Sequence, residues 1–491
     1  MDLVIRAATV YDGSGGRALQ TDVGVAADRI AAIGDLAAEP AAQVVDATGL
    51  ALAPGFVDVH SHDDFAVFLT PEMDFKVGQG VTTDVVGNCG LGAAPFSAAR
   101  AYLAFFGADR RSNALPEWDD YADYLDAVDH DPPSCNVSVL AAHGPLRLDA
   151  MGNARRPAAE AEVAHMADAL GAALDAGCVG FSSGLIYEPG RYADTAELIA
   201  LAQVMGGIGG LYATHMRDEG LHLLDAVREA IEIGERGGVP VQISHHKASN
   251  PAAWGLVRQS LALIDEARAR GIDVTADQYP YTAGSTSLFA VVQNAEEGIA
   301  GPADWTRIAV ASSPGHPEWE GRTIAELGDA MDREPIDAAK AIIDAEGYGA
   351  VVIIHSMDED DVRTVMAHPT TMIGSDGIPT LTGKPHPRLY GTFARVLGRY
   401  ARDERVLPIE EAVHRMTGLP ATKFGLTDRG SIVEGAYADL VLFDPATVDD
   451  VATYESPRRH PAGIHGVWVN GTAVVRDGEH TGARPGRALR R

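Results

Sequence analysis

The sequence predicts an α/β fold: a (β/α)8, TIM-like barrel with a small β domain built from both ends of the chain and a lid inserted in the barrel. Three observations predict this fold. Short apolar runs alternate with amphipathic helical segments between residues 55 and 376, which is typical of parallel βα units. Both ends of the chain show short strands and turns without helical periodicity. Nearly every candidate strand of the middle segment ends in a residue that can bind a metal.

The two ends of the chain are expected to form one small β domain. Residues 3–5, 8–10 and 23–25 are apolar runs separated by turn residues, and residues 439–443 and 467–471 repeat this style. Chain ends often lie close together, which makes a shared sheet feasible. We therefore assign residues 1–54 and 430–491 to this domain and residues 55–429 to the barrel. A chain of 491 residues is long enough for both.

The middle of the chain contains nine candidate strands, one more than a closed barrel of about eight strands uses. They are residues 55–60, 81–86, 136–142, 179–185, 210–215, 239–244, 272–276, 351–354 and 371–374. We assign residues 351–354 to an insertion over residues 285–357, where we expect them to pair with residues 307–311. Insertions of this length usually serve as lids or binding loops, so we expect a lid.

Side chains that can bind a metal follow these strands. The first strand ends at His60 and His62, and the later ones end at Cys89, His143, His215, His245 and Asp376. In a (β/α)8 barrel the carboxyl ends of the strands converge on one mouth, where catalytic residues collect. Imidazole, thiolate and carboxylate are ligands that suit Zn²⁺. The sequence therefore predicts a zinc site there, with Asp376 placed to carry a proton from metal-bound water to a leaving amine.

Each of these residues also has a purely structural interpretation. A lone histidine is more often a hydrogen-bonded core residue than a ligand, and one His-x-His pair can arise by chance among 17 histidines. Cys89 could be a small buried hydrophobic residue, and Asp376 could start an Asx turn. The metal interpretation depends on the repetition at several strand ends. Cys135 and Cys178 lie at the opposite ends of their strands and are expected to be structural.

Charge and composition limit the partners and the location. The chain has 39 Lys and Arg against 69 Asp and Glu, a formal charge of −30, which disfavours nucleic acid and membrane surfaces as partners. It also repels carboxylate substrates, so a site for one must supply local donors; the candidates are Lys247, Arg388, Tyr279 and Tyr281, although each could be a solvated surface residue. Three scattered cysteines, no secretion signal and no apolar span predict a cytoplasmic protein.

Several motifs together resemble one known family. The chain is similar to the amidohydrolase superfamily in its β-rich start and at Pro54-Gly55-Phe56-Val57-Asp58-Val59-His60-Ser61-His62, His215, His245 and Gly374-Ser375-Asp376-Gly377. Within it, the chain resembles the N-acyl-D-amino-acid deacylases (D-aminoacylases) at Gly87-Asn88-Cys89-Gly90 and at residues 184–193, 244–249, 279–286 and 384–388. The resemblance spans essentially the whole chain. It implies a barrel, a late lid and a terminal domain that is a β-sandwich.

The resemblance also implies roles for individual residues. The residues implied for a tightly bound zinc are Cys89, His215 and His245, and those for a weaker second site are His60, His62, Cys89 and Asp376. Those implied for the substrate are Lys247, Arg388 and Tyr279 or Tyr281 at its carboxylate, Tyr187 near its acyl oxygen, and Ser285. Many superfamily members bridge two metals with a carboxylated lysine at the end of the fourth strand. Residues 180–185 contain no lysine, which excludes such a bridge here.

The expected reaction is zinc-dependent hydrolysis of N-acyl-D-amino acids, with Asp376 as general base and then general acid. Two alternatives stay open. A cyclic amidase of the hydantoinase or dihydroorotase kind would keep the fold, but such enzymes usually rely on the carboxylated lysine. A catalytically inactive scaffold would have lost ligands that are all present here. The preference for D over L comes from the resemblance alone, and the substrate side chain, the acyl group and the oligomeric state are open.

Overall fold

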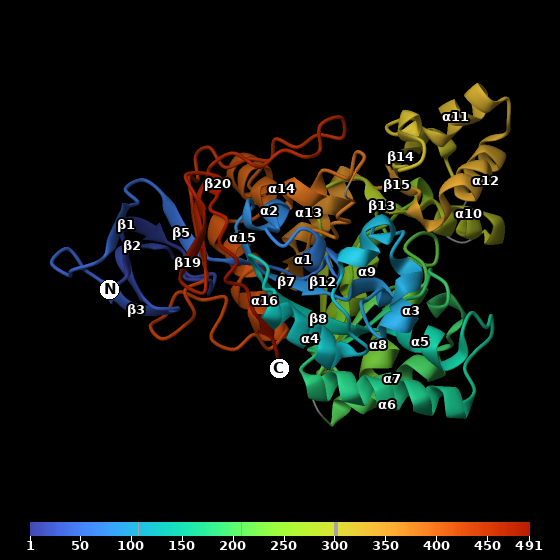
Figure 1. The fold of residues 1–491 in the computed structure, drawn as a ribbon, viewed down its shortest axis with the longest axis horizontal. Helices are drawn as coiled ribbons and strands as arrows, with labels where there is room; N and C mark the ends of the chain where they lie inside the picture. The colour runs from blue at the N-terminus through green and yellow to red at the C-terminus, as the bar shows by residue number, and fades with distance from the viewer. Residues whose placement is uncertain (107, 208, 299–302, 381) are drawn as a thin grey trace.

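The centre of the protein is a closed barrel of eight parallel strands (Figure 1), seen in a computed structural model that describes residues 1–106, 108–207, 209–298, 303–380 and 382–491. Neighbouring strands are hydrogen-bonded in chain order: β6 (Phe56–Asp58), β7 (Val81–Val86), β8 (Asn136–Ala142), β9 (Gly180–Gly184), β10 (Leu211–His215), β11 (Val241–Ile243), β12 (Val274–Gln278) and β16 (Thr371–Ile373). A parallel bridge between Ser61 and Gly377 joins the first strand to the last. The predicted fold class is confirmed.

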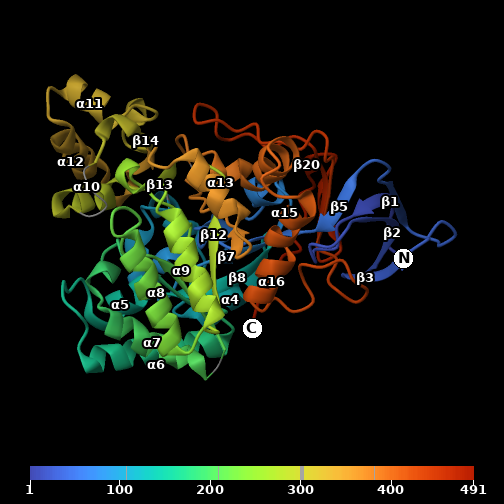
Figure 2. The same cartoon turned by 180° about the vertical axis from the view of Figure 1, so that it is seen from behind.

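Helices cover the outside of the barrel (Figures 1 and 2). The longer ones are α4 (Tyr121–His130), α5 (His143–Met151), α6 (Glu160–Ala176), α7 (Thr195–Gly206), α8 (Leu223–Gly237), α9 (Val257–Ala269), α13 (Glu359–Ala367), α14 (Arg388–Arg395) and α15 (Ile409–Met416). Helix α8 buries Leu223, Val227 and Ile231, which recur at helical spacing and so form one apolar face. Because the strands are covered outside and packed inside, their residues are buried on both faces, polar ones included, as in β7 and β9.

Short helices complete the chain, and none of the helices in the described residues combines the length and apolarity needed to cross a bilayer. The short ones are α1 (Ala66–Leu69), α2 (Asp74–Val77), α3 (Phe96–Ala99) and α16 (Gly418–Lys423). A C-terminal strand, β21 (Ala488–Leu489), adds to the barrel sheet by pairing with β8 at Val137 and Ser138.

Both ends of the chain contribute to a second sheet, seen as neighbouring blue and red strands in Figure 1. Its order is β20-β19-β18-β17-β5-β1-β2-β3, with β4 paired to β1. The strands are β1 (Leu3–Val10), β2 (Leu19–Ala26), β3 (Arg29–Gly34), β4 (Gln43–Asp46), β5 (Ala51–Pro54), β17 (Leu440–Phe443), β18 (Ile464–Val469), β19 (Thr472–Arg476) and β20 (Glu479–His480). Antiparallel pairing of β17 with β5 joins the two ends. The domain boundaries at residues 54 and 430 stay predictions.

A small α/β unit stands beside the mouth of the barrel (Figures 1 and 2). Strands β13 (Gly284–Ser287), β15 (Val351–Ile354) and β14 (Ile308–Ser312) form an antiparallel sheet, and α10 (Leu288–Glu297), α11 (Ile324–Met331) and α12 (Pro335–Glu346) pack on it. The unit has an apolar core of its own, which includes Leu288, Ile308 and Val352. The expected pairing of residues 351–354 with residues 307–311 is confirmed for residues 308–310; Arg307 precedes β14, and an irregularity at Ala311 makes Ser312 the partner of Val351. We call this unit the lid.

A buried lysine lies among carboxylates of the first two barrel strands and of the segment that follows the first strand. Lys76 of α2 has no solvent exposure, and its Nζ lies 2.5 Å from Asp58 Oδ2, 3.0 Å from Asp63 Oδ2 and 3.4 Å from Asp84 Oδ1. Burial alone would lower the pKa of Lys76, but the charge of Asp58 and its neighbours outweighs burial and holds that pKa well above its ordinary value. The ammonium group therefore ties α2 to β6 and β7.

Replacing Lys76 with methionine is expected to lower the free energy of unfolding by about 3–5 kcal/mol, because buried carboxylates lose the cation that compensates them. Urea denaturation followed by circular dichroism measures the change. The matched control is Lys340→Met, since Lys340 is exposed and pairs with Glu296 at 2.8 Å; its replacement is expected to leave the free energy of unfolding nearly unchanged. Equal stability of Lys76→Met and wild type would mean that the carboxylates need no cation.

Candidate metal centre

The predicted metal ligands meet at the carboxyl ends of the barrel strands, and all are buried. They form three overlapping groups, in each of which the ligand atoms lie within 4.8 Å of one another: His60, Cys89 and His245; His60, His62 and Asp376; and His215, Glu219 and His245. The second and third groups share His60 and His245, respectively, with the first. The structure therefore brings all six predicted ligands to one mouth and adds Glu219.

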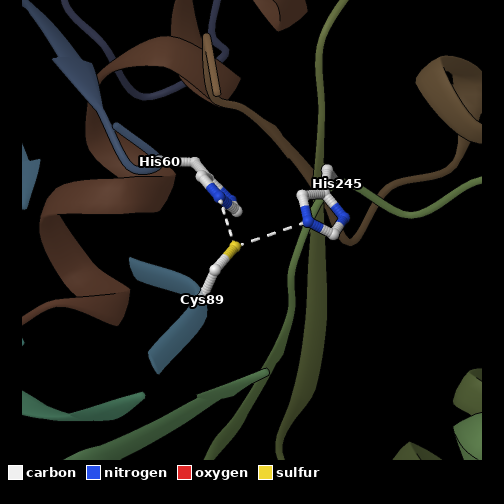
Figure 3. Close-up of side chains that lie close together, drawn as sticks. All are labelled: His60, Cys89 and His245. Carbon is white, nitrogen blue, oxygen red and sulfur yellow. Dashed lines mark hydrogen bonds between the residues drawn. The ribbon is translucent and has the colours of Figure 1, made fainter. Parts of the chain in front are cut away.

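Cys89 is the point at which two of the imidazoles meet (Figure 3). Its Sγ lies 3.2 Å from Nε2 of His60 and 3.5 Å from Nε2 of His245. Zinc bonds of about 2.3 Å to sulfur and about 2.0 Å to nitrogen, arranged tetrahedrally, place ligand atoms roughly 3.3–3.6 Å apart, so these separations suit a shared ion. Burial alone would raise the pKa of the thiol, but the charges of His60 and His245 hold it well below its ordinary value. These neighbours therefore favour the thiolate form of Cys89, which is the form that binds a metal.

Three residues of the site adopt a backbone conformation that is uncommon for residues with a side chain. The φ angle is +55° at Cys89, +36° at His245 and +50° at Asp376, and such conformations cost on the order of 1 kcal/mol each. Gly87, with φ +82°, precedes the cysteine turn, and a Cβ there would lie 2.1 Å from the carbonyl oxygen of Leu140. The turn that directs the thiol into the barrel mouth therefore requires glycine at this position.

Asp376 connects the imidazoles to a buried guanidinium. Its Oδ1 lies 3.1 Å from Nε2 of His62 and 3.5 Å from Nε2 of His60, and its Oδ2 lies 2.9 Å from Nη1 of Arg388. Burial alone would raise the pKa of Asp376, but the charges of Arg388 and His60 hold it well below its ordinary value. The carboxylate is therefore ionised at neutral pH and can bind a metal or accept a proton.

Two buried carboxylates that the sequence analysis missed orient the histidines. Asp277 Oδ1 lies 3.0 Å from Nδ1 of His60 and accepts a 2.8 Å hydrogen bond from the backbone N–H of His245. Glu219 Oε1 lies 2.8 Å from Nδ1 of His245 and 2.7 Å from Nζ of Lys247. A carboxylate at Nδ1 leaves Nε2 to face a metal. Asp277 lies near the carboxyl end of β12. Attention to polar residues at strand ends identified the predicted ligands, and it could have identified Asp277 as well.

His143, another histidine at a strand end, does not join this centre. Its Nε2 lies 2.9 Å from Glu197 Oε1, which also accepts a 2.9 Å hydrogen bond from Nε of Arg147. The structural interpretation is therefore correct for this histidine. Cys135 and Cys178 are buried free thiols outside the three ligand groups found among the described residues.

A pocket of about 200 Å³ opens beside the ligands, between the mouth and the lid. Four of the predicted substrate-binding residues line it: Tyr187, Lys247, Tyr279 and Ser285. The ligands His215, His245 and Asp376 line it as well. Burial alone would lower the pKa of Lys247, but the charge of Glu219 raises it above its ordinary value, so the pocket holds an ammonium group.

The other two predicted substrate residues lie behind this pocket. Arg388 is fully buried, with its guanidinium carbon 4.4 Å from the ring centre of Tyr279 and its Nη2 donating a 3.3 Å hydrogen bond to the carbonyl oxygen of Ser285. Tyr281 donates a 3.2 Å hydrogen bond to Asp450 Oδ2 and is not among the pocket-lining residues. Of the two tyrosines that the resemblance left open, the structure therefore brings Tyr279 to the site and not Tyr281.

A thiolate, imidazoles and a carboxylate at the mouth of a (β/α)8 barrel, beside a pocket with a cation, define the class of metal-dependent hydrolases. The chain matches the amidohydrolase family over residues 43–297 and 253–475. It belongs to that family, in the group that contains the D-aminoacylases.

Curated relatives and a solved structure match the whole chain. A D-aminoacylase of Alcaligenes xylosoxydans xylosoxydans is 42% identical and an N-acyl-D-glutamate deacylase of the same organism is 43% identical; each match covers 100% of this chain and 98% and 97% of the relatives. The structure of an N-acyl-D-glutamate deacylase from Bordetella bronchiseptica, complexed with zinc and a phosphonate mimic of the tetrahedral intermediate, has a TM-score of 0.91 at 42% identity and covers 100% of both chains.

Proposed function

We propose that the protein is a zinc-dependent N-acyl-D-amino-acid deacylase, which hydrolyses an amide to a D-amino acid and a carboxylic acid. One observation carries the proposal: the Cys89 thiolate lies within 3.5 Å of two imidazole nitrogens, beside a pocket in which Lys247 offers a cation. The thiolate and imidazoles are donors that could hold a metal ion, and the Lys247 ammonium could bind a substrate carboxylate. The names of the relatives at 42% and 43% identity support this substrate class.

The donor set fits zinc, and we assign it as two sites. Cys89, His215 and His245 would hold a tightly bound ion, and His60, His62 and Asp376, with Cys89, a weaker second ion. Nδ1 of His215 lies 2.8 Å from Nε2 of His245, and that Nε2 lies 3.5 Å from Cys89 Sγ, which supports a site formed by these three residues. When bound, zinc supplies a Lewis acid for the acyl carbonyl and makes water nucleophilic near neutral pH.

Asp376 is the proton carrier in the proposed mechanism. It accepts a proton from the attacking water and then delivers that proton to the departing amine. Tyr187 stays protonated because burial raises its pKa well above the ordinary value, so its hydroxyl, now 3.0 Å from Thr286 Oγ1, can donate to the acyl oxygen. Developing negative charge on that oxygen is thereby stabilised.

The substrate carboxylate binds at the cationic and phenolic donors of the pocket. Lys247 and Tyr279 line the pocket directly, and we also assign Ser285 to substrate binding. Arg388 lies behind Tyr279 and beside Asp376, so its charge favours an anion in the pocket. A chain with a net charge of −30 repels an anionic substrate unless the site supplies local positive charge, and Lys247 and Arg388 supply it.

A substrate panel tests the proposal. We expect zinc-loaded protein to hydrolyse N-acetyl-D-amino acids and to leave the L-enantiomers intact, and a chelator is expected to remove the activity until zinc is added back. Ninhydrin detection of released amine and elemental analysis measure both. Chelator-resistant hydrolysis, or equal rates on both enantiomers, would contradict the proposal.

The same panel separates the alternatives. Hydantoins are expected to be inert, because β9 reads Gly-Phe-Ser-Ser-Gly and offers no lysine for carboxylation. Less than about one tenth of a zinc per chain after metal-replete expression would instead favour the inactive scaffold. We further propose a small-molecule substrate as the partner and a cytoplasmic location, which the three buried free thiols support and cell fractionation tests.

A further inference from the structure

We infer that this chain takes N-acyl-D-amino acids with uncharged, apolar side chains, and that the Asp304–Arg307 pair of the lid is a specificity determinant against a second carboxylate. The inference rests on the proposed function and deepens it. Relatives named for D-amino acids in general and for D-glutamate match this chain almost equally, at 42% and 43% identity. Overall sequence identity therefore does not distinguish a preference for neutral substrates from one for acidic substrates. The residues of the pocket have to decide it.

Much of the pocket lining is apolar. Its apolar members come from α10 and the sheet of the lid and from two loops of the barrel: Ala290, Val291, Ala295, Ile308, Ile354, Ile186 and Pro251. An apolar substrate group that fills this space removes apolar surface from water on both sides. A carboxylate placed there would lose its hydration and would gain no hydrogen-bond donor from these side chains.

Only a cationic side chain could compensate the charge of a second carboxylate, since the neutral donors that also line the pocket, such as Thr286 and Asn294, carry no charge. Among the described residues that line the pocket, those with a permanent positive charge are Lys247 and Arg307. Lys247 already lies 2.7 Å from Glu219 Oε1 and is assigned to the α-carboxylate. His355 also lines the pocket, but burial and the charge of Arg307 lower its pKa, so it is neutral at pH 7. Arg307 is therefore the remaining candidate.

Arg307 stands at the exposed side of the pocket, where Asp304 offsets part of its charge. Its Nε lies 3.4 Å from Oδ2 of Asp304, and its side chain is 46% exposed. Asp304 lines the pocket together with two further carboxylates, Asp218 and Glu219. A second substrate carboxylate would have to displace Asp304 from Arg307 and would meet this negative field.

The test compares N-acetyl-D-leucine with N-acetyl-D-glutamate on the full-length zinc-loaded protein. We expect wild-type kcat/KM to favour leucine by about 100-fold or more, the size of an unpaired buried charge. Asp304→Asn frees Arg307 and removes one repelling charge, so the glutamate-to-leucine ratio of kcat/KM should rise about 10-fold. The matched control is Asp329→Asn, since Asp329 is an exposed residue of α11 in the same lid and its replacement should leave the ratio unchanged.

Each result bears on a different claim. A wild-type preference for N-acetyl-D-glutamate that Arg307→Met abolishes would show that Arg307 binds a second carboxylate and would overturn this inference while leaving the deacylase function standing. If Asp304→Asn, like Asp329→Asn, leaves the glutamate-to-leucine ratio of kcat/KM unchanged, the ion pair is not a determinant of specificity. Inactivity of zinc-loaded protein on both substrates would overturn the proposed function, and this inference with it.

Discussion

Replacing Cys89 with alanine is expected to leave less than about one tenth of a zinc per chain and to lower kcat/KM for an N-acetyl-D-amino acid by about 1,000-fold or more. Its thiolate lies 3.2 Å from His60 Nε2 and 3.5 Å from His245 Nε2, so it is placed to contact a metal in either of the proposed sites. Its loss leaves neutral nitrogen ligands and one carboxylate, which bind zinc more weakly than a set that includes sulfur. Elemental analysis and amine release measure the two effects.

The chain provides two matched controls for this substitution. Cys135→Ala and Cys178→Ala remove a thiol that is equally buried and equally free of disulfide bonds but lies outside the ligand groups described. Both variants should bind zinc and turn over normally, with at most a loss of about 1 kcal/mol in stability from the small cavity. Full zinc occupancy and wild-type turnover in Cys89→Ala would contradict the assigned centre.

Replacing Asp376 with asparagine is expected to preserve the tightly bound zinc and to lower kcat by about 100- to 10,000-fold, the range of a lost general acid–base group. The amide keeps the size of the side chain and tolerates the φ of +50°, but it cannot accept a proton and return it. KM for the substrate should change less than kcat, because the assigned carboxylate-binding groups remain. Zinc analysis and steady-state kinetics separate the two contributions.

Asp477→Asn is the control for the backbone conformation. Asp477 is exposed and has a φ of +53°, so the same substitution occurs in the same left-handed region, away from the pocket. Its activity and stability should match those of the wild type. Turnover of Asp376→Asn close to the wild-type rate would remove this residue from the mechanism.

The barrel and its mouth were predictable because both follow from local patterns. Strands buried on both faces read as short apolar runs, and parallel connection brings their carboxyl ends to one rim. That reasoning placed His60, Cys89, His215, His245 and Asp376 together, and in the structure they fall into overlapping groups whose ligand atoms lie within 4.8 Å of one another. It could not exclude His143, because the partner that keeps it out of the centre, Glu197, is 54 residues away.

The sequence by itself determined the fold class, the family and the set of metal-competent side chains, since all three depend on residue type and on order along the chain. The tertiary structure decided which of these side chains lie close together, that Asp277 and Glu219 contact the histidines at Nδ1, and that Tyr279 rather than Tyr281 reaches the pocket. It also decided that Asp304 already holds Arg307 at the lid. These facts concern distances of a few ångströms between residues far apart in the chain, and packing of the whole barrel and lid sets such distances, whereas spacing along the sequence does not.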